Sequence, residues 1–324
     1  MIPDIPVDER IDLPQWGTWP ESVHLFDQAS ADAVLAALAA ERPLLVRGEP
    51  GSGKSQLARA AAQVLGRVFV SSVVHSRSEA QDLQWEYDAV ARLGEAQVLA
   101  TVKSDLGHRE RLDPRRYLVP GPLWWIFNWQ SAATQVKDYS LCKANPPAKP
   151  KDWTPEQGAV LLIDEIDKAE ADLPNSLLET LGNGAFPVPW LDQPVCLSPE
   201  APAPLVVITT NEERELPAAF LRRCMVLKLQ LPTNPDDLIT CLVKRGGEHF
   251  GADCTAPVRT LVAEQLVKDR AKALDLGRPA PGQAEYLDIL RALVHARGAD
   301  EGEQRALFQR IARFALDKTG VGSP

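Results

Sequence analysis

Long apolar runs are absent from this sequence, and so is a basic N-terminal segment followed by an apolar stretch. A membrane-spanning helix needs about 20 consecutive apolar residues, and a secretory leader needs the missing N-terminal pattern. We therefore expect a cytoplasmic protein that does not enter a membrane. Cysteine is also scarce, and the 5 cysteines form no C-x-x-C pair. This distribution argues against a zinc site and against a disulfide framework.

An excess of positive charge is missing as well. The 324 residues include 35 Lys and Arg against 44 Asp and Glu, which gives a formal net charge of −9. Nucleic acids attract clustered Lys and Arg, so we expect no nucleic-acid partner. The 5 histidines never fall at metal-ligand spacing, and we assign them no metal and no catalytic role. The remaining composition, 45% apolar and 24% charged, is that of an ordinary globular protein.

The most specific pattern in the chain follows the apolar run 43–46, which predicts a buried strand. Residues 48–55 fit G-x-x-x-x-G-K-[ST], and residues 55–65 have the period of a helix, so the flanking elements suit a phosphate-binding loop. Its glycines let backbone N–H groups surround a phosphate, while Lys54 would reach the β- and γ-phosphates and Ser55 would bind Mg²⁺. The residues expected to bind a nucleoside triphosphate are Gly48, Glu49, Pro50, Gly51, Ser52, Gly53, Lys54, Ser55 and Gln56.

Residues 67–74 predict a second buried strand, and a further apolar strand, residues 159–163, ends in two adjacent acids, Asp164 and Glu165. Asp164 would hold Mg²⁺, and Glu165 would orient and deprotonate an attacking water. Neighbouring side chains on a strand face opposite ways, so both acids reach one site only because the strand ends there. An acidic loop that caps the next helix is the alternative. The phosphate-binding pattern upstream favours the catalytic interpretation.

Two polar features follow later strands. Residues 204–210 predict a strand that ends at Asn211, whose side chain could hydrogen-bond the attacking water or the γ-phosphate. Arg222 and Arg223 precede the last predicted core strand, residues 225–231. They are either surface charges or, if subunits form a ring, cations offered to a neighbour's nucleotide.

The rest of the chain indicates an α/β domain between an N-terminal arm and a helical C-terminal domain. We expect residues 1–28 to lie on the surface without regular structure, and residues 29–232 to form the α/β nucleotide-binding domain. Within that domain we expect a helix over 79–94, a short strand over 97–102, and a flexible proline-rich loop over 143–155. Residues 233–324 form the helical domain, with helices over 236–249, 258–274, 283–297 and 303–316.

Five segments together resemble the AAA+ ATPases and, more narrowly, their MoxR-like branch. They are Gly48-Glu-Pro-Gly-Ser-Gly-Lys-Ser, Asp82-Leu-Gln-Trp-Glu-Tyr-Asp, Tyr117-Leu-Val-Pro-Gly-Pro-Leu, Leu161-Leu-Ile-Asp-Glu-Ile-Asp-Lys-Ala and Leu216-Pro-Ala-Ala-Phe-Leu-Arg-Arg-Cys. The resemblance implies a five-stranded parallel sheet flanked by helices, a small helical lid, and ATP and Mg²⁺ as ligands. It also implies two β-hairpin insertions, and residues 95–120 and 185–198 lie at the positions expected for them.

The resemblance assigns roles to several residues. Asn211 would be sensor 1, and Arg222 or Arg223 would be the arginine finger, with Arg223 fitting the family pattern better although Cys224 replaces the usual Phe. The usual sensor 2 pattern is absent, and Arg278 or Arg291 is the substitute. MoxR-like proteins assemble as hexameric rings and often act with a partner that carries a von Willebrand factor A (VWA) domain.

Two functions of different classes follow. The first is a ring-forming ATPase that drives chaperone-like remodelling or assembly of a partner protein complex. The second is a slow nucleotide-dependent signalling switch or scaffold in a stress or conflict system. The intact Glu165 favours an active enzyme, and the altered sensor 2 region leaves room for a slow one. The acidic balance disfavours a third option, a DNA-acting motor.

Overall fold

The computed structural model describes residues 3–101, 108–140 and 146–316. The chain divides into two compact units, and both are discontinuous in sequence. The first unit contains residues 1–6, 28–47 and 58–227. The second contains residues 7–27, 48–57 and 228–324. The phosphate-loop segment thus groups with the C-terminal helices rather than with the strand that precedes it.

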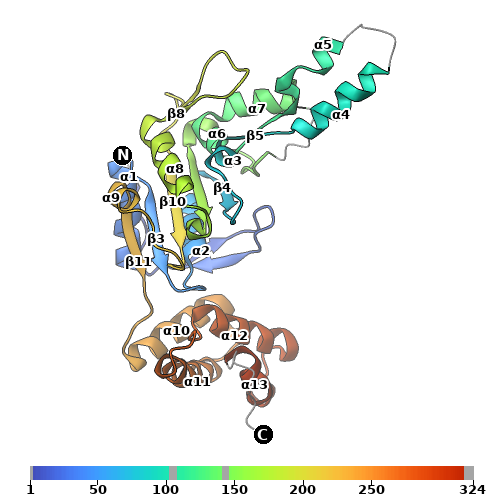
Figure 1. Ribbon diagram of the computed structural model, residues 1–324. Coiled ribbons are helices and arrows are strands. Elements are labelled where there is room, and N and C mark those ends of the chain that lie inside the picture. Colours follow the sequence, from blue (N-terminus) through green and yellow to red (C-terminus); the bar gives the residue numbers. More distant parts are fainter. Residues whose placement is uncertain (1–2, 102–107, 141–145, 317–324) are drawn as a thin grey trace. The chain divides into compact units, whose positions relative to one another are not determined.

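A five-stranded sheet forms the core of the first unit, in the order β11-β3-β10-β7-β4 (Figure 1). Strand β10 pairs in parallel with both β3 and β7, and β7 pairs in parallel with β4. Residues 159–163 are all buried, as expected for a parallel strand covered on both faces. The expected α/β fold with a five-stranded sheet is confirmed. The strands are β3 (Leu44–Gly48), β4 (Val68–Val73), β7 (Ala159–Asp164), β10 (Leu205–Thr210) and β11 (Met225–Leu229).

The pairing register fixes where the strands end. Val207 of β10 lies opposite Leu44 of β3 and Leu162 of β7, so these three neighbouring strands finish at the same edge of the sheet. In parallel α/β sheets this carboxyl edge is where ligands bind.

Helices flank the sheet, and α6 packs against both β4 and β7. The helices are α1 (Gln28–Ala40), α2 (Lys54–Leu65), α3 (Ala80–Gln84), α4 (Ala89–Ala100), α5 (His108–Arg111), α6 (Pro122–Phe127), α7 (Trp129–Asp138), α8 (Asp172–Asn183) and α9 (Ala218–Arg223). Helix α2 starts in the phosphate-loop segment and continues into the first unit. Short 3-10 turns occupy η1 (Pro114–Tyr117), η2 (Pro155–Gln157) and η3 (Ile166–Lys168).

The insertion between β4 and α6 differs from the β-hairpin expected over residues 95–120. Helix α4 continues to Ala100, so the strand expected over 97–102 is wrong as far as the described residues extend, and residues 102–107 lie outside them. A short apolar run fits a helix as well as a strand, and here the Asp88 carboxylate caps α4 by accepting the Ala91 N–H at 2.7 Å. The pairing in this region is between β5 (Trp85–Tyr87) and β6 (Leu118–Pro120).

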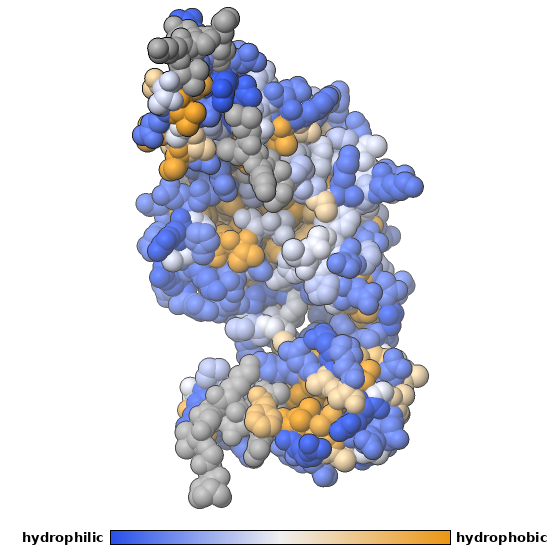
Figure 2. Space-filling model, turned by 90° about the vertical axis from the view of Figure 1, so that its right-hand side faces the viewer, coloured by the Kyte–Doolittle hydropathy of each residue, from blue (hydrophilic) through white to orange (hydrophobic). Residues whose placement is uncertain are grey.

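Helices α4 and α5 extend away from the sheet (Figure 1). Three apolar side chains of α4, those of Val90, Leu93 and Val98, are exposed. Orange residues lie beside the grey stretch at the top of Figure 2, where this insertion is seen. The second hairpin, expected over residues 185–198, is present as β8 (Ala185–Phe186) and β9 (Val195–Cys196). Of the loop expected over 143–155, residues 143–145 lie outside the described residues, and Trp153 is buried.

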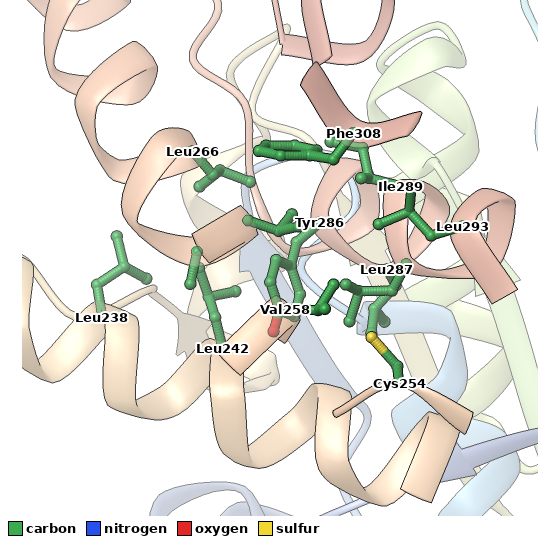
Figure 3. Packing of buried hydrophobic residues seen from close by; sticks show 13 residues of the cluster. Leu238, Leu242, Cys254, Val258, Leu266, Tyr286, Leu287, Ile289, Leu293 and Phe308 are labelled. Carbon is green, nitrogen blue, oxygen red and sulfur yellow. The ribbon is translucent and has the colours of Figure 1, made fainter. Parts of the chain in front are cut away.

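The four C-terminal helices pack around one apolar core (Figure 3). They are α10 (Pro235–Phe250), α11 (Ala256–Asp275), α12 (Gln283–Arg297) and α13 (Glu301–Leu316), with the short η4 (Gly251–Asp253) after α10. Tyr286 is fully buried at its centre, and its hydroxyl donates to the Arg259 carbonyl oxygen at 3.2 Å. Burying a large apolar side chain contributes about 1.5–3 kcal/mol, so this core stabilises the helices as a unit. Among the described residues, no helix combines the length and apolar character that a membrane span requires.

The N-terminal arm has regular structure, contrary to expectation. Strands β1 (Ile11–Leu13) and β2 (Ser22–His24) form an antiparallel hairpin, and β2 contacts α10. The Asp8 carboxylate pairs with the Lys244 ammonium at 2.6 Å, and the Arg10 guanidinium donates to the Glu248 carbonyl oxygen. The hairpin therefore belongs to the same unit as the C-terminal helices, which sequence spacing alone could not predict.

Candidate active site

The phosphate-binding loop, residues 48–55, has a backbone that requires glycine at two of its positions. A Cβ at Gly48 would lie 2.4 Å from the Leu229 carbonyl oxygen, so no larger residue fits. Gly51 has φ +74°, in the left-handed region, and a Cβ there would lie 2.6 Å from the Ala284 Cβ. These two glycines are thus explained by close approach of neighbouring residues rather than by flexibility.

Polar groups of this loop are arranged for an anion. The Lys54 ammonium, a buried group, donates to the carbonyl oxygens of Gly48 and Glu49 at 2.8 and 2.9 Å. The Ser52 hydroxyl is buried and has no hydrogen-bond partner in the described part of the chain. A buried hydroxyl without a partner is costly, and an added acceptor would satisfy it. Phosphate oxygens are such acceptors, so the loop residues fit a nucleoside triphosphate.

The carboxyl ends of β7 and β10 bring polar side chains together, and we call this group the acidic edge: Asp164, Glu165, Asp167, Thr209 and Asn211. The Thr209 hydroxyl donates to the Asp164 carboxylate and accepts the Glu165 backbone N–H, the latter at 2.9 Å. Glu165 itself has φ +61°, a left-handed conformation that is uncommon for a residue with a side chain. This turn ends the strand directly after Asp164.

Both oxygens of the Glu165 carboxylate are held by neighbouring side chains. The Asn211 amide donates to Oε1 at 3.3 Å, and the Lys168 ammonium donates to Oε2 at 2.6 Å. The hydrogen bond that Lys168 donates to Glu165 raises the pKa of the lysine above its ordinary value, so the lysine stays protonated at neutral pH. A carboxylate held in this way can accept a proton from a water placed beside it.

Asp167 fixes the loop that carries Asn211. Its carboxylate is almost fully buried and accepts the backbone N–H groups of Asn211 and Glu213, at 3.4 and 2.9 Å. A buried carboxylate is stabilised by such charge-assisted hydrogen bonds. Nearby, the Arg47 guanidinium at the end of β3 pairs with the Glu212 carboxylate after β10. The ends of these strands are therefore joined by side chains as well as by the sheet.

Comparison with known proteins places the chain in a family. The AAA domain (dynein-related subfamily) matches residues 43–224, more than half of the sequence. The chain belongs to the AAA domain family. No curated protein matches it. Among solved structures, a mutant of Thermotoga maritima RuvB is similar, with 13% identity, a TM-score of 0.39, and coverage of 89% of this chain and 75% of that chain.

The two arginines expected near the site lie in the last turn of α9 in this AAA domain. Arg222 and Arg223 are both exposed, and within the described residues neither makes an ion pair. Cys224 follows them and is buried, and burial raises the pKa of its thiol to about 12. The thiol is therefore protonated at neutral pH and packs as a small apolar group.

Three arginines of the C-terminal helical region lie in different surroundings. Arg291 is exposed and pairs with Asp288 of its own helix at 2.6 Å, and Arg278 is exposed beyond the end of α11. Arg270 of α11 approaches the phosphate-binding loop, pairing with the Glu49 carboxylate at 2.9 Å while donating to the Pro281 carbonyl oxygen at 3.0 Å. Its side chain is only 13% exposed.

Sequence analysis missed four residues, namely Thr209, Lys168 and Asp167 at the acidic edge, and Arg270 beside the phosphate-binding loop. The first three lie within segments already singled out, and a polar residue within a few positions of a predicted catalytic residue is the signal that could have indicated them. Arg270 lies mid-helix among other charged residues, and no local pattern separates it from solvent-exposed charge.

Proposed function

We propose that this AAA chain hydrolyses ATP and uses the reaction to drive chaperone-like remodelling or assembly of a partner protein complex, as MoxR-like proteins do. The observation that carries the proposal is the Glu165 carboxylate, which an amide from the adjacent strand end holds at 3.3 Å. A chain that only bound nucleotide would not need a fixed carboxylate at the end of the strand where AAA domains activate water.

The residues have distinct roles in this reaction. Backbone N–H groups of residues 48–55 bind the phosphates, and the Lys54 ammonium leaves its carbonyl partners for the β- and γ-phosphates. Glu165 accepts the proton of the attacking water, and Asn211 holds both the carboxylate and that water in position. Ser55 and Asp164 offer oxygen ligands of the kind that Mg²⁺ prefers. When bound there, the ion neutralises charge that develops on the phosphates.

Arginine from a second subunit completes the site. Arg222 or Arg223, exposed at the end of α9, is offered to the nucleotide of the next subunit in a hexameric ring or spiral. Such an arginine contributes about 10³–10⁵ to the rate, so an isolated subunit would turn over slowly. The partner is a protein with a VWA domain, or another protein complex, on the strength of the MoxR-like resemblance.

The test is ATP turnover per subunit over a range of protein concentrations, with molecular mass measured by size exclusion alongside. Turnover should rise as subunits assemble, and Glu165→Gln should lower it by about 10²–10⁴ while ATP still binds, because a general base is lost. Arg222→Ala and Arg223→Ala, examined separately, identify the contributing arginine. Turnover that is independent of concentration in the native chain would contradict the shared site.

One observation favours the second candidate, a slow switch. The Lys168 ammonium donates to Oε2 of the Glu165 carboxylate at 2.6 Å and so occupies one of the two oxygens that could accept a proton from water. Negligible turnover at every concentration, with ATP still bound, would support the switch and exclude the remodelling motor.

A further inference from the structure

A cleft in the first unit lies away from the acidic edge. We call it the tryptophan cleft, and it has a volume of about 240 Å³. It lies where α6 meets α7, beside η2, the start of β7 and the segment after β9. Gly158 and Ala159 line it, whereas Asp164 ends the same strand. At about 3.3 Å per residue, the two ends of β7 are roughly 17 Å apart, so the cleft is separate from the proposed ATP chemistry.

Three tryptophans form one wall. The Trp129 ring contacts those of Trp125 and Trp153 edge to face, with centroid distances of 4.8 and 4.7 Å. Trp125 and Trp153 are each only 5% exposed, while Trp129 is half-buried at the cleft. The Trp153 indole N–H donates to the Gly158 carbonyl oxygen at 3.1 Å. The wall is therefore preformed, and a ligand would not have to order it.

These rings are not all core filling. Trp124, their neighbour, is buried, and its indole N–H donates to the Ser131 hydroxyl at 3.0 Å. Trp129 instead is only half-buried, and it lines the open space of the cleft. Aromatic faces carry negative electrostatic potential and attract cations.

The charge of the cleft has one sign. Two carboxylates line it, those of Glu156 and Glu200, and both residues are exposed. A hydrogen bond from the Thr154 side chain holds the pKa of Glu156 below its ordinary value, so this carboxylate is ionised at neutral pH. Among the described residues that line the cleft there is no Lys, Arg or His. The complementary ligand therefore carries positive charge, donates hydrogen bonds and has a flat apolar surface.

We propose that the tryptophan cleft binds an arginine side chain of a partner protein. A guanidinium is planar, stacks on aromatic rings and presents five N–H donors to carboxylates. A lysine ammonium is not planar and does not present a pair of parallel N–H donors to a carboxylate. A proline-rich segment carries no positive charge and would leave the two carboxylates without a partner. The cleft holds one side chain, so affinity for an isolated arginine is low and the rest of the partner adds to it.

The probe is N-acetyl-arginine amide, with N-acetyl-citrulline amide as its neutral isostere. Binding to the full chain is followed by the indole N–H resonances in ¹⁵N-labelled protein. The arginine probe should shift the Trp129 and Trp153 signals saturably, and citrulline should bind at least about tenfold more weakly, since a desolvated cation–π contact is lost. Equal binding of the two probes, or no shift with either, would overturn the proposal.

Matched variants distinguish the effect on binding of a negative charge at the cleft from that of a negative charge elsewhere on the surface. Glu156→Gln and Glu200→Gln should each weaken the arginine probe by about threefold to tenfold, as expected for a charge-assisted hydrogen bond. Glu179→Gln changes an exposed glutamate on α8, outside the cleft, and should leave binding unchanged. ATP turnover should be the same in all three. A proline-rich peptide that binds more tightly than the arginine probe would show that the rings recognise an extended segment instead.

Discussion

The acidic edge and the phosphate-binding loop are held in place by different parts of the chain. In the acidic edge, side chains from neighbouring strand ends bond one another, as Thr209 bonds Asp164 and Asn211 bonds Glu165. In the phosphate-binding loop, Lys54 bonds carbonyl oxygens of the loop itself, and Glu49 pairs with Arg270 of α11. The sheet thus fixes the groups for chemistry. The groups for binding depend on the C-terminal helices.

The largest effect should come from breaking the acidic edge without touching a carboxylate. Thr209→Val keeps the shape of the side chain but removes the hydroxyl that bonds Asp164 and the Glu165 N–H. Misplacement of a catalytic group by about 1 Å can cost 10²-fold, so we expect ATP turnover to fall by roughly 10- to 100-fold. Thr210→Val is the matched control, because Thr210 is equally buried and its hydroxyl accepts only the Glu212 N–H among the described contacts. An equal loss of turnover in both variants would contradict a specific role for Thr209.

A second effect, on stability rather than on turnover, should separate the two units by pH. Burial lowers the pKa of both His24 and His249 to about 4, with Arg245 adding to this for both residues. Above the ordinary histidine pKa of about 6.5, both are neutral whether folded or unfolded, and the unit keeps its full stability. As pH falls from 6.5 toward 4, the unfolded chain binds protons that the folded chain does not. Each pKa is lowered by roughly 2.5, and a pKa difference of one corresponds to about 1.4 kcal/mol, so the two histidines together should cost the second unit on the order of 5 kcal/mol of stability over this range.

Hydrogen exchange at pH 7 and pH 4.5 measures this separation. Amides of α10 should lose protection at the lower pH before those of β7 and β10. His24→Phe should reduce the loss, because the Nε2 of His24 is buried without a partner in the described residues and the Phe26 ring lies 4.6 Å away. Uniform loss of protection in both units would show that these histidines do not act locally.

The smallest effect should appear in ATP affinity. Arg270→Gln leaves the Glu49 carboxylate uncompensated beside the bound phosphates, and we expect ATP to bind about threefold to tenfold more weakly, a typical effect for a partly exposed charge. The double variant Glu49→Gln with Arg270→Gln should recover most of the affinity, because both charges are gone. Arg291→Gln, which removes an exposed arginine paired on its own helix, is the control for calorimetric titration. Failure of the double variant to recover would mean that Arg270 acts through something other than Glu49.

The contrast between the regions also explains what the sequence could predict. Local patterns specify the strands and the loop, because burial on both faces makes β7 uniformly apolar and the glycine-rich pattern marks where the backbone must pass close to its neighbours. These local patterns predicted the bounds of the sheet strands and of the four C-terminal helices to within a few residues. The roles assigned to Glu165, Asn211, Arg222 and Arg223 remain predictions.

The sequence was least informative where a contact spans a long distance or a short run is ambiguous. The pairing of Arg270 with Glu49 joins residues 221 positions apart, and no spacing rule links them. The end of helix α4, residues 97–100, was predicted to be a strand, because a run as short as 97–102 spans too few residues to separate a period of two from one of 3.6. The N-terminal hairpin was predicted to be irregular chain, because strands of 3 residues are too short to show a period of two in the sequence.

That hairpin has a consequence for how the chain folds in time. Asp8 and its partner Lys244 are separated by 236 residues. The N-terminal hairpin therefore leaves the ribosome long before helix α10 does. At synthesis rates of about 5–20 residues per second, α10 is synthesised roughly 10 to 50 s after the hairpin. During this interval α10 is not yet available to pack against β2, whereas four of the five sheet strands, β3, β4, β7 and β10, are already synthesised. The second unit therefore closes last, after nearly the whole chain has been made.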